Sequence, residues 1–125
     1  MKDILVRGDI IRLLDRFYDR LFSDDIIGHF FTDVMDLSRK EHMPIMYNFW
    51  DSILLGAANY HGNPMEKHIR LSDRSPMHKE HFERWLLLWT QSVDELFKGS
   101  KAEEAKKRAA DIAMLMEFKV QNHSA

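Results

Sequence analysis

Apolar side chains recur every three to four residues along most of the chain, which is the spacing of one face of an α-helix. In the first such segment Asp9 is the expected N-cap, and a short helical turn is expected from Ser23 to Gly28. The apolar positions between them are Ile10, Leu13, Leu14, Phe17, Tyr18 and Leu21. No segment alternates apolar and polar residues for long enough to indicate a strand. The pattern therefore predicts an all-α protein.

A second helix is expected to begin at Ser38, where Glu41 completes a capping box, and to end at Gly56. Pro44 complicates this segment because a proline inside a helix lacks the N–H and clashes with the carbonyl four residues earlier. Two alternatives remain: the helix kinks at Pro44, or 38–43 forms a separate turn and the regular helix begins at Pro44. Both alternatives bend the chain beside His42.

The remaining segments also contain residues that are typical of helix starts. Residues 60–68 read as a tight loop that leads into a short helix capped by Asn63, with His68 held about one turn further along. A long helix is expected from Ser75 to Phe97, and a final helix begins at Ser100, where Glu103 again completes a capping box.

Composition narrows the class of protein. The chain has 125 residues, enough for one domain over residues 1–125, and its 20 acidic and 18 basic residues nearly balance. The chain therefore has no excess of positive charge that would indicate binding to nucleic acid. Cysteine is absent, which removes disulfides, thiol catalysis and zinc–thiolate sites. Neither a signal peptide nor an apolar run of membrane-spanning length is found, so we expect a cytoplasmic protein without a membrane span.

Histidines carry the candidate chemistry, since the sequence lacks the common catalytic motifs. His42 and His68 lie on the edges of two expected helices, and large apolar residues surround both in the sequence. Together with Phe30, Phe31 and Trp85 they would line a flat apolar slot, which suits a haem whose iron is bound by one imidazole. Two alternatives to a haem protein remain open. One is a haem-free helical interaction domain whose aromatic residues form its core, and the other is a small metal-binding bundle that uses His78 and His81.

Four motifs occur in an order that resembles a known family. They are Phe17–Leu21, Asn48–Gly56, the run Tyr60-x-Gly62-x-Pro64-x-x-x-His68, and His81–Leu86. Together they resemble the third group of truncated haemoglobins, the short globins of bacteria, over nearly the whole chain. The paired-glycine motifs typical of the first two groups are absent, which agrees with the third.

The resemblance implies a globin-like two-over-two helical sandwich around haem b. It implies the following site residues: His68 as the proximal iron ligand, Phe31 and Met46 against the haem, and Tyr18, His42 and Trp85 as the distal polar trio. The hydroxyl of Tyr18 or the indole N–H of Trp85 would donate to the partly negative oxygen of a bound ligand.

The segment 70–79 is longer than the usual loop of the family, and Arg70, Arg74 and His78 within it are candidate partners of the haem propionates. The resemblance implies binding of oxygen, nitric oxide, carbon monoxide or peroxide, with a reductase as a candidate partner. It leaves open whether the protein is a carrier for oxygen transport or an enzyme with peroxidase-like or nitric oxide-detoxifying activity.

Overall fold

The computed structural model describes residues 1–30, 39–57 and 77–124. Four helices occupy most of these residues: α1 (Arg7–Ser23), α2 (Arg39–Leu55), α4 (Lys79–Leu96) and α5 (Ser100–Ser124). The described ranges contain helices and turns and no strand, so the all-α prediction is confirmed. None of the helices in these ranges combines the length and the hydropathy that crossing a membrane requires.

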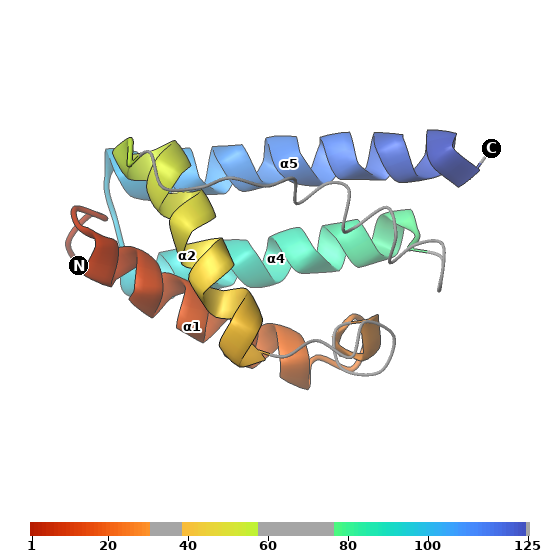
Figure 1. The fold of residues 1–125 in the computed structure, drawn as a ribbon, viewed down its shortest axis with the longest axis horizontal. Helices are drawn as coiled ribbons and strands as arrows, with labels where there is room; N and C mark the ends of the chain where they lie inside the picture. Colours follow the sequence, from red (N-terminus) through yellow and green to blue (C-terminus); the bar gives the residue numbers. More distant parts are fainter. Residues whose placement is uncertain (31–38, 58–76, 125) are drawn as a thin grey trace.

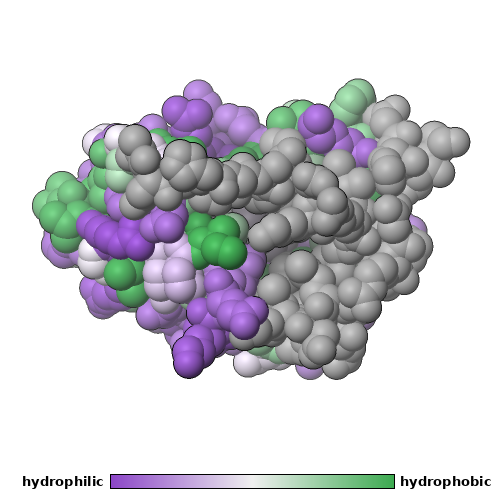
Figure 2. Space-filling model, viewed as in Figure 1, coloured by the Kyte–Doolittle hydropathy of each residue, from purple (hydrophilic) through white to green (hydrophobic). Residues whose placement is uncertain are grey.

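The described helices pack as two pairs, α1 with α2 and α4 with α5, as the predicted two-over-two sandwich requires. Helices α4 and α5 run antiparallel and lie side by side, while α2 crosses α1 (Figure 1). Helix α1 also packs against α4, and α2 touches α5 more lightly. In the coloured part of the face shown in Figure 2, hydrophobic side chains stand in small groups among hydrophilic ones.

Aromatic side chains from three helices meet around Trp89 at the centre of the core. Trp89 of α4 is fully buried, and its ring stacks on Trp50 of α2 with the ring centroids 4.2 Å apart. Phe17 of α1 meets the same indole edge-on at 5.1 Å. The indole N–H donates to the carbonyl of Ala105 in α5 at 3.1 Å, so one side chain contacts each of the other helices that the structure describes.

Helix α1 begins earlier than the sequence predicted. Val6 is the N-cap, and Asp9 is the third helical residue rather than the cap. The Asp9 carboxylate reaches back and accepts hydrogen bonds from the N–H groups of Leu5 at 2.9 Å and Val6 at 3.2 Å. An acidic side chain at this position satisfies free N–H groups of the preceding turn, which explains why the prediction was wrong by three residues.

Helix α2 is continuous through Pro44, so the alternative in which a separate turn precedes this proline is wrong. Pro44 lies in the second turn after Arg39, where the missing N–H removes only the hydrogen bond to the carbonyl of Lys40. Ser38, the predicted start, lies outside the described residues.

Helix α4 begins later than predicted, at Lys79, with His78 as its N-cap. Its first turn is stabilised by His81, whose Nδ1 accepts the backbone N–H of His78 at 2.8 Å. Met77 and His78 are therefore outside the helix, whereas the sequence had placed its start at Ser75.

The start of α5 is capped from the other end of the chain. The Asp3 carboxylate accepts the N–H groups of Lys101 at 2.9 Å and Ala102 at 2.8 Å, in place of the predicted box between Ser100 and Glu103. Gly99 has a φ of 143°, and a Cβ there would lie 2.5 Å from Cγ of Asp3. Glycine therefore permits both the backbone turn and the approach of the cap.

We expect Asp3→Ala to lower the free energy of unfolding by about 1–2 kcal/mol, because two N–H groups at the start of α5 lose their acceptor. Partial burial opposes ionisation, but the hydrogen bonds from Lys101, Ile4 and Ala102 lower the pKa of Asp3 overall. The contribution of the ionised cap should therefore be lost as the pH falls through this lowered pKa. Urea unfolding at neutral and acidic pH measures both effects, and Asp25→Ala, a substitution of an exposed residue, is the control. Equal stability of the two variants at neutral pH would contradict the role of Asp3 as the cap of α5.

Candidate functional site

A small enclosed cavity lies where the four helices meet. It has a volume of about 30 Å³, which is room for one small molecule. Its lining is Phe17, Tyr18, Met46, Phe49, Trp50, Trp85, Ile112 and Met116. Three of the predicted site residues, Tyr18, Met46 and Trp85, therefore come together around one space. The lining is apolar apart from the hydroxyl of Tyr18 and the indole N–H groups, a composition suited to an uncharged ligand that accepts few hydrogen bonds.

The hydroxyl of Tyr18 and Nε2 of His42 lie 2.9 Å apart, within hydrogen-bond distance. Tyr18 comes from the second half of α1 and is buried, while His42 comes from the first turn of α2 and is half-buried. The sequence left open whether Pro44 turns His42 away from the site. The continuous helix instead directs the imidazole toward Tyr18, with ring centroids 5.2 Å apart.

Burial raises the pKa of Tyr18 well above the usual tyrosine value, although the guanidinium of Arg39 acts in the opposite direction. The hydroxyl is therefore a neutral group that can donate one hydrogen bond and accept another. When Nε2 of His42 is unprotonated, the hydroxyl donates to it; when Nε2 carries a proton, the hydroxyl accepts and its own proton is free for a ligand.

Trp85 reaches the cavity from α4. Its ring is buried, lies parallel to Trp89 and meets Phe17 edge-on with centroids 5.7 Å apart. These two aromatic contacts restrict the orientation of the indole.

A half-buried ion pair next to Trp85 was not found from the sequence. Nε and Nη2 of Arg84 donate to the same carboxylate oxygen of Asp24, at 2.9 and 2.6 Å, and the Asp24 side chain is only 5% exposed. The second oxygen accepts the N–H groups of Ile26 and Ile27 at 3.1 Å. Hydrogen bonding to Arg84 lowers the pKa of Asp24. The ion pair connects the turn after α1 to α4. The sequence marked the start of this turn, Ser23-Asp24-Asp25, but did not indicate a partner for Asp24.

The other predicted site residues are placed only in part. Phe31, His68, Arg70 and Arg74 lie outside the described residues, so their roles stay predictions. His78 is exposed at the start of α4, with its ring centroid 5.7 Å from that of His81.

The alternative of a metal site at His78 and His81 gains no support. Nδ1 of His81 is already occupied by the backbone N–H of His78. Within 1–30, 39–57 and 77–124, no three histidine, aspartate or glutamate side chains are grouped so that they could hold a metal ion.

Sequence reasoning did not single out Phe49, Trp50, Ile112 and Met116 as site residues, although they line the cavity. They belong to apolar helix faces whose spacing predicts burial, and nothing in that spacing separates a cavity wall from ordinary core. The resulting cavity, apolar apart from the Tyr18 hydroxyl and the indole N–H groups, fits the distal side of a haem, where ligand binding depends on hydrogen-bond donors and steric access.

Comparison with known proteins agrees with this architecture. The sequence model of the family described as "Bacterial-like globin" matches residues 5–122. The group 3 truncated hemoglobin ctb of Campylobacter jejuni is 33% identical over 107 residues, which cover 83% of this chain and 82% of that protein. The crystal structure of the group III truncated hemoglobin from C. jejuni has a TM-score of 0.83 and 30% identity, covering 96% of this chain and 95% of the other.

The helical sandwich and these matches together define a haem-binding globin, a class whose members bind small diatomic ligands. More specifically, the chain belongs to the bacterial-like globin family and is a truncated haemoglobin of the third group. The alternative of a haem-free interaction domain is thereby set aside.

We expect Tyr18 to stay neutral when free tyrosine ionises, at about pH 10. The tyrosinate absorbance of the folded wild type and of Tyr18→Phe should therefore rise alike up to about pH 11. In the unfolded state Tyr18 ionises normally, so its contribution to stability is present below about pH 10 and is lost as the pH rises toward the raised folded pKa. A wild-type tyrosinate signal that exceeds that of the variant at this pH would contradict a buried neutral hydroxyl.

Proposed function

We propose that the chain binds haem b through His68 and retains oxygen or another small ligand in a distal pocket formed by Tyr18, His42 and Trp85. The observation that carries this proposal is the hydrogen bond between His42 and Tyr18, a residue that lines an apolar cavity. His68 would hold the haem, which would supply an iron atom able to bind a diatomic molecule. Phe31 and Met46 would pack on the haem face, and Arg70, Arg74 and His78 would pair with its propionates.

Tyr18 is suited to hold a ligand because its hydroxyl is buried, neutral and fixed in position. His42 holds this hydroxyl in place from the α2 side, so the oxygen atom is positioned before a ligand arrives. One hydrogen bond contributes on the order of 1 kcal/mol, and more when the acceptor carries negative charge. The indole of Trp85, which lines the same cavity, would supply a second donor from α4.

The same pair supports a second candidate function in redox or detoxification chemistry, such as turnover of peroxide or nitric oxide. His42 is half-buried and hydrogen-bonded to Tyr18, so a proton can pass between solvent, the imidazole and the hydroxyl at the cavity. This function, like oxygen transport, would operate in the cytoplasm. A reductase would be the partner of the redox form. Peroxide turnover by the haem-loaded protein, compared with free haemin, distinguishes the enzyme from the carrier.

For the cofactor, we expect wild-type protein reconstituted with haemin to give a sharp Soret band at one haem per chain. His68→Ala should lose or strongly shift this band, because the imidazole is the proposed axial ligand. His123→Ala, near the end of α5, serves as the matched control and should behave like the wild type. An unchanged spectrum and affinity in His68→Ala would remove this residue from the iron.

For the distal pocket, we expect Tyr18→Phe to speed oxygen dissociation by about fivefold or more, which corresponds to the loss of about 1 kcal/mol. The matched control is Tyr47→Phe, because the Tyr47 hydroxyl donates to Asp15 outside the cavity. Stopped-flow measurements of both variants give the rates. Equal dissociation rates for Tyr18→Phe and the wild type would exclude the Tyr18 hydroxyl from ligand retention.

A further inference from the structure

Arg39, the first residue of α2, contacts α1 on both sides of Tyr18. Its Nη1 forms an ion pair with the carboxylate of Asp19 at 2.7 Å. Its Nη2 donates to the backbone carbonyl of Asp15 at 3.0 Å. Its guanidinium carbon lies 5.5 Å from the ring centroid of Phe22. These partners follow α1 from about one turn before Tyr18 to about one turn after it.

His42 lies three residues after Arg39, so the two side chains are neighbours on the first turn of α2. A shift or rotation of this turn moves both of them together. Nε2 of His42 lies 2.9 Å from the hydroxyl of Tyr18, and two such atoms about 3.6 Å apart no longer form a hydrogen bond. A displacement of about 0.7 Å is therefore enough to break this hydrogen bond. The pair requires that the first turn of α2 is placed accurately on α1.

Other contacts of α2 act further along the helix. The hydroxyl of Tyr47, five residues after His42, donates to the carboxylate of Asp15. Trp50, eight residues after His42, stacks on Trp89 of α4. Both contacts lie more than one helical turn beyond the imidazole, whereas the guanidinium described above comes from within one turn of it.

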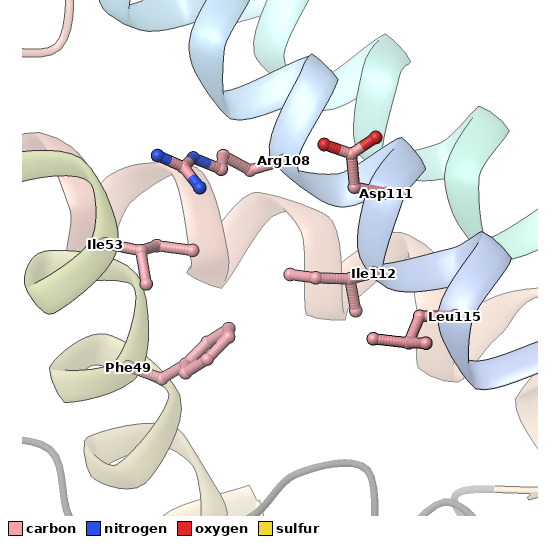
Figure 3. Close-up of a pocket in the computed structure, with 6 residues that line it drawn as sticks. All are labelled: Phe49, Ile53, Arg108, Asp111, Ile112 and Leu115. Atoms are coloured by element: carbon pink, nitrogen blue, oxygen red, sulfur yellow. The ribbon is translucent and has the colours of Figure 1, made fainter. Parts of the chain in front are cut away.

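Helix α5 leaves the position of α2 loosely defined. The two helices touch more lightly than α1 and α2 do. Figure 3 shows the apolar side chains of both helices around one open pocket, Phe49 and Ile53 from α2 and Ile112 and Leu115 from α5. The first half of α2 therefore depends mainly on its contacts with α1.

The guanidinium of Arg39 is better suited to placing a neighbour than to stabilising the fold. The side chains of Arg39 and Asp19 are 38% and 56% exposed, and ion pairs exposed to this extent contribute little to stability. The planar fork nevertheless directs separate N–H groups at a carboxylate and at a carbonyl, which fixes both the distance and the orientation of α2. Its charge also reaches the pocket, since it opposes the rise that burial causes in the pKa of Tyr18.

We propose that Arg39 is a positioning residue of the distal pocket: its guanidinium fixes the first turn of α2 on α1 and so holds Nε2 of His42 at the hydroxyl of Tyr18. Arg39 is not among the residues that line the enclosed cavity, so it acts through this pair. The effect on a bound ligand rests on the proposed function, whereas the placement of His42 is a property of the protein with or without an active haem.

The placement of His42 is tested by ¹⁵N NMR of its imidazole at about pH 8, where an ordinary imidazole is neutral. Haem-loaded protein is measured in the carbon monoxide form, which is diamagnetic. In Arg39→Gln the Nε2 signal should move toward that of a solvent-exposed imidazole. Arg7→Gln is the matched control, because Arg7 also joins α1 to α2 and is 41% exposed, but its partner Asp51 lies nine residues after His42. An unmoved signal in Arg39→Gln, or an equal shift in both variants, would overturn the proposal.

The consequence for the ligand is tested by oxygen dissociation. Arg39→Gln should speed dissociation by about threefold, less than Tyr18→Phe does, because the hydroxyl itself remains. In the Tyr18→Phe background the same substitution should change nothing further, since the group that it positions is gone. A wild-type rate in Arg39→Gln, or equal acceleration in both backgrounds, would overturn the positioning role. Failure of the proposed function shows separately, as a missing Soret band or an unchanged rate in Tyr18→Phe, and the NMR measurement depends on neither.

Discussion

The structure depends most on the packing around Trp89. This indole lies in α4, stacks on Trp50 of α2, meets Phe17 of α1 edge-on and donates to the Ala105 carbonyl of α5. Aromatic contacts of this kind each contribute about 0.5–1.5 kcal/mol beyond burial. Because the same side chain contacts α1, α2 and α5, a shift of any one of these helices disturbs the packing around it.

This constraint explains how a chain of 125 residues keeps an enclosed chamber open. The residue before Tyr18 packs on Trp89, and Trp85 lies one helical turn before it. The chamber is therefore bounded on two sides by residues that the core already fixes. The ion pair of Arg84 and Asp24 adds a second attachment beside Trp85 and also satisfies the turn after α1. Rigid supports of this kind hold hydrogen-bond donors in place before a ligand arrives.

Much of the fold could be predicted from the sequence, because helical periodicity and capping residues are local signals. The cap of α5 could not, since Asp3 lies at the other end of the chain from the N–H groups it accepts. The distal pair could be named only through the family motifs; periodicity marks Tyr18 as buried but says nothing about its partner. The direction of His42 also required the structure, because Pro44 is compatible with a kink or a break and only the fold shows a continuous helix.

Retention of a ligand in the proposed pocket depends on hydrogen bonds, and the groups that would supply them, Tyr18, His42 and Trp85, belong to α1, α2 and α4. The aliphatic side chains that line the same cavity, Met46, Ile112 and Met116, carry no hydrogen-bond donor. Loss of one of the polar groups would therefore change the affinity for the ligand, because it acts on the bound state alone.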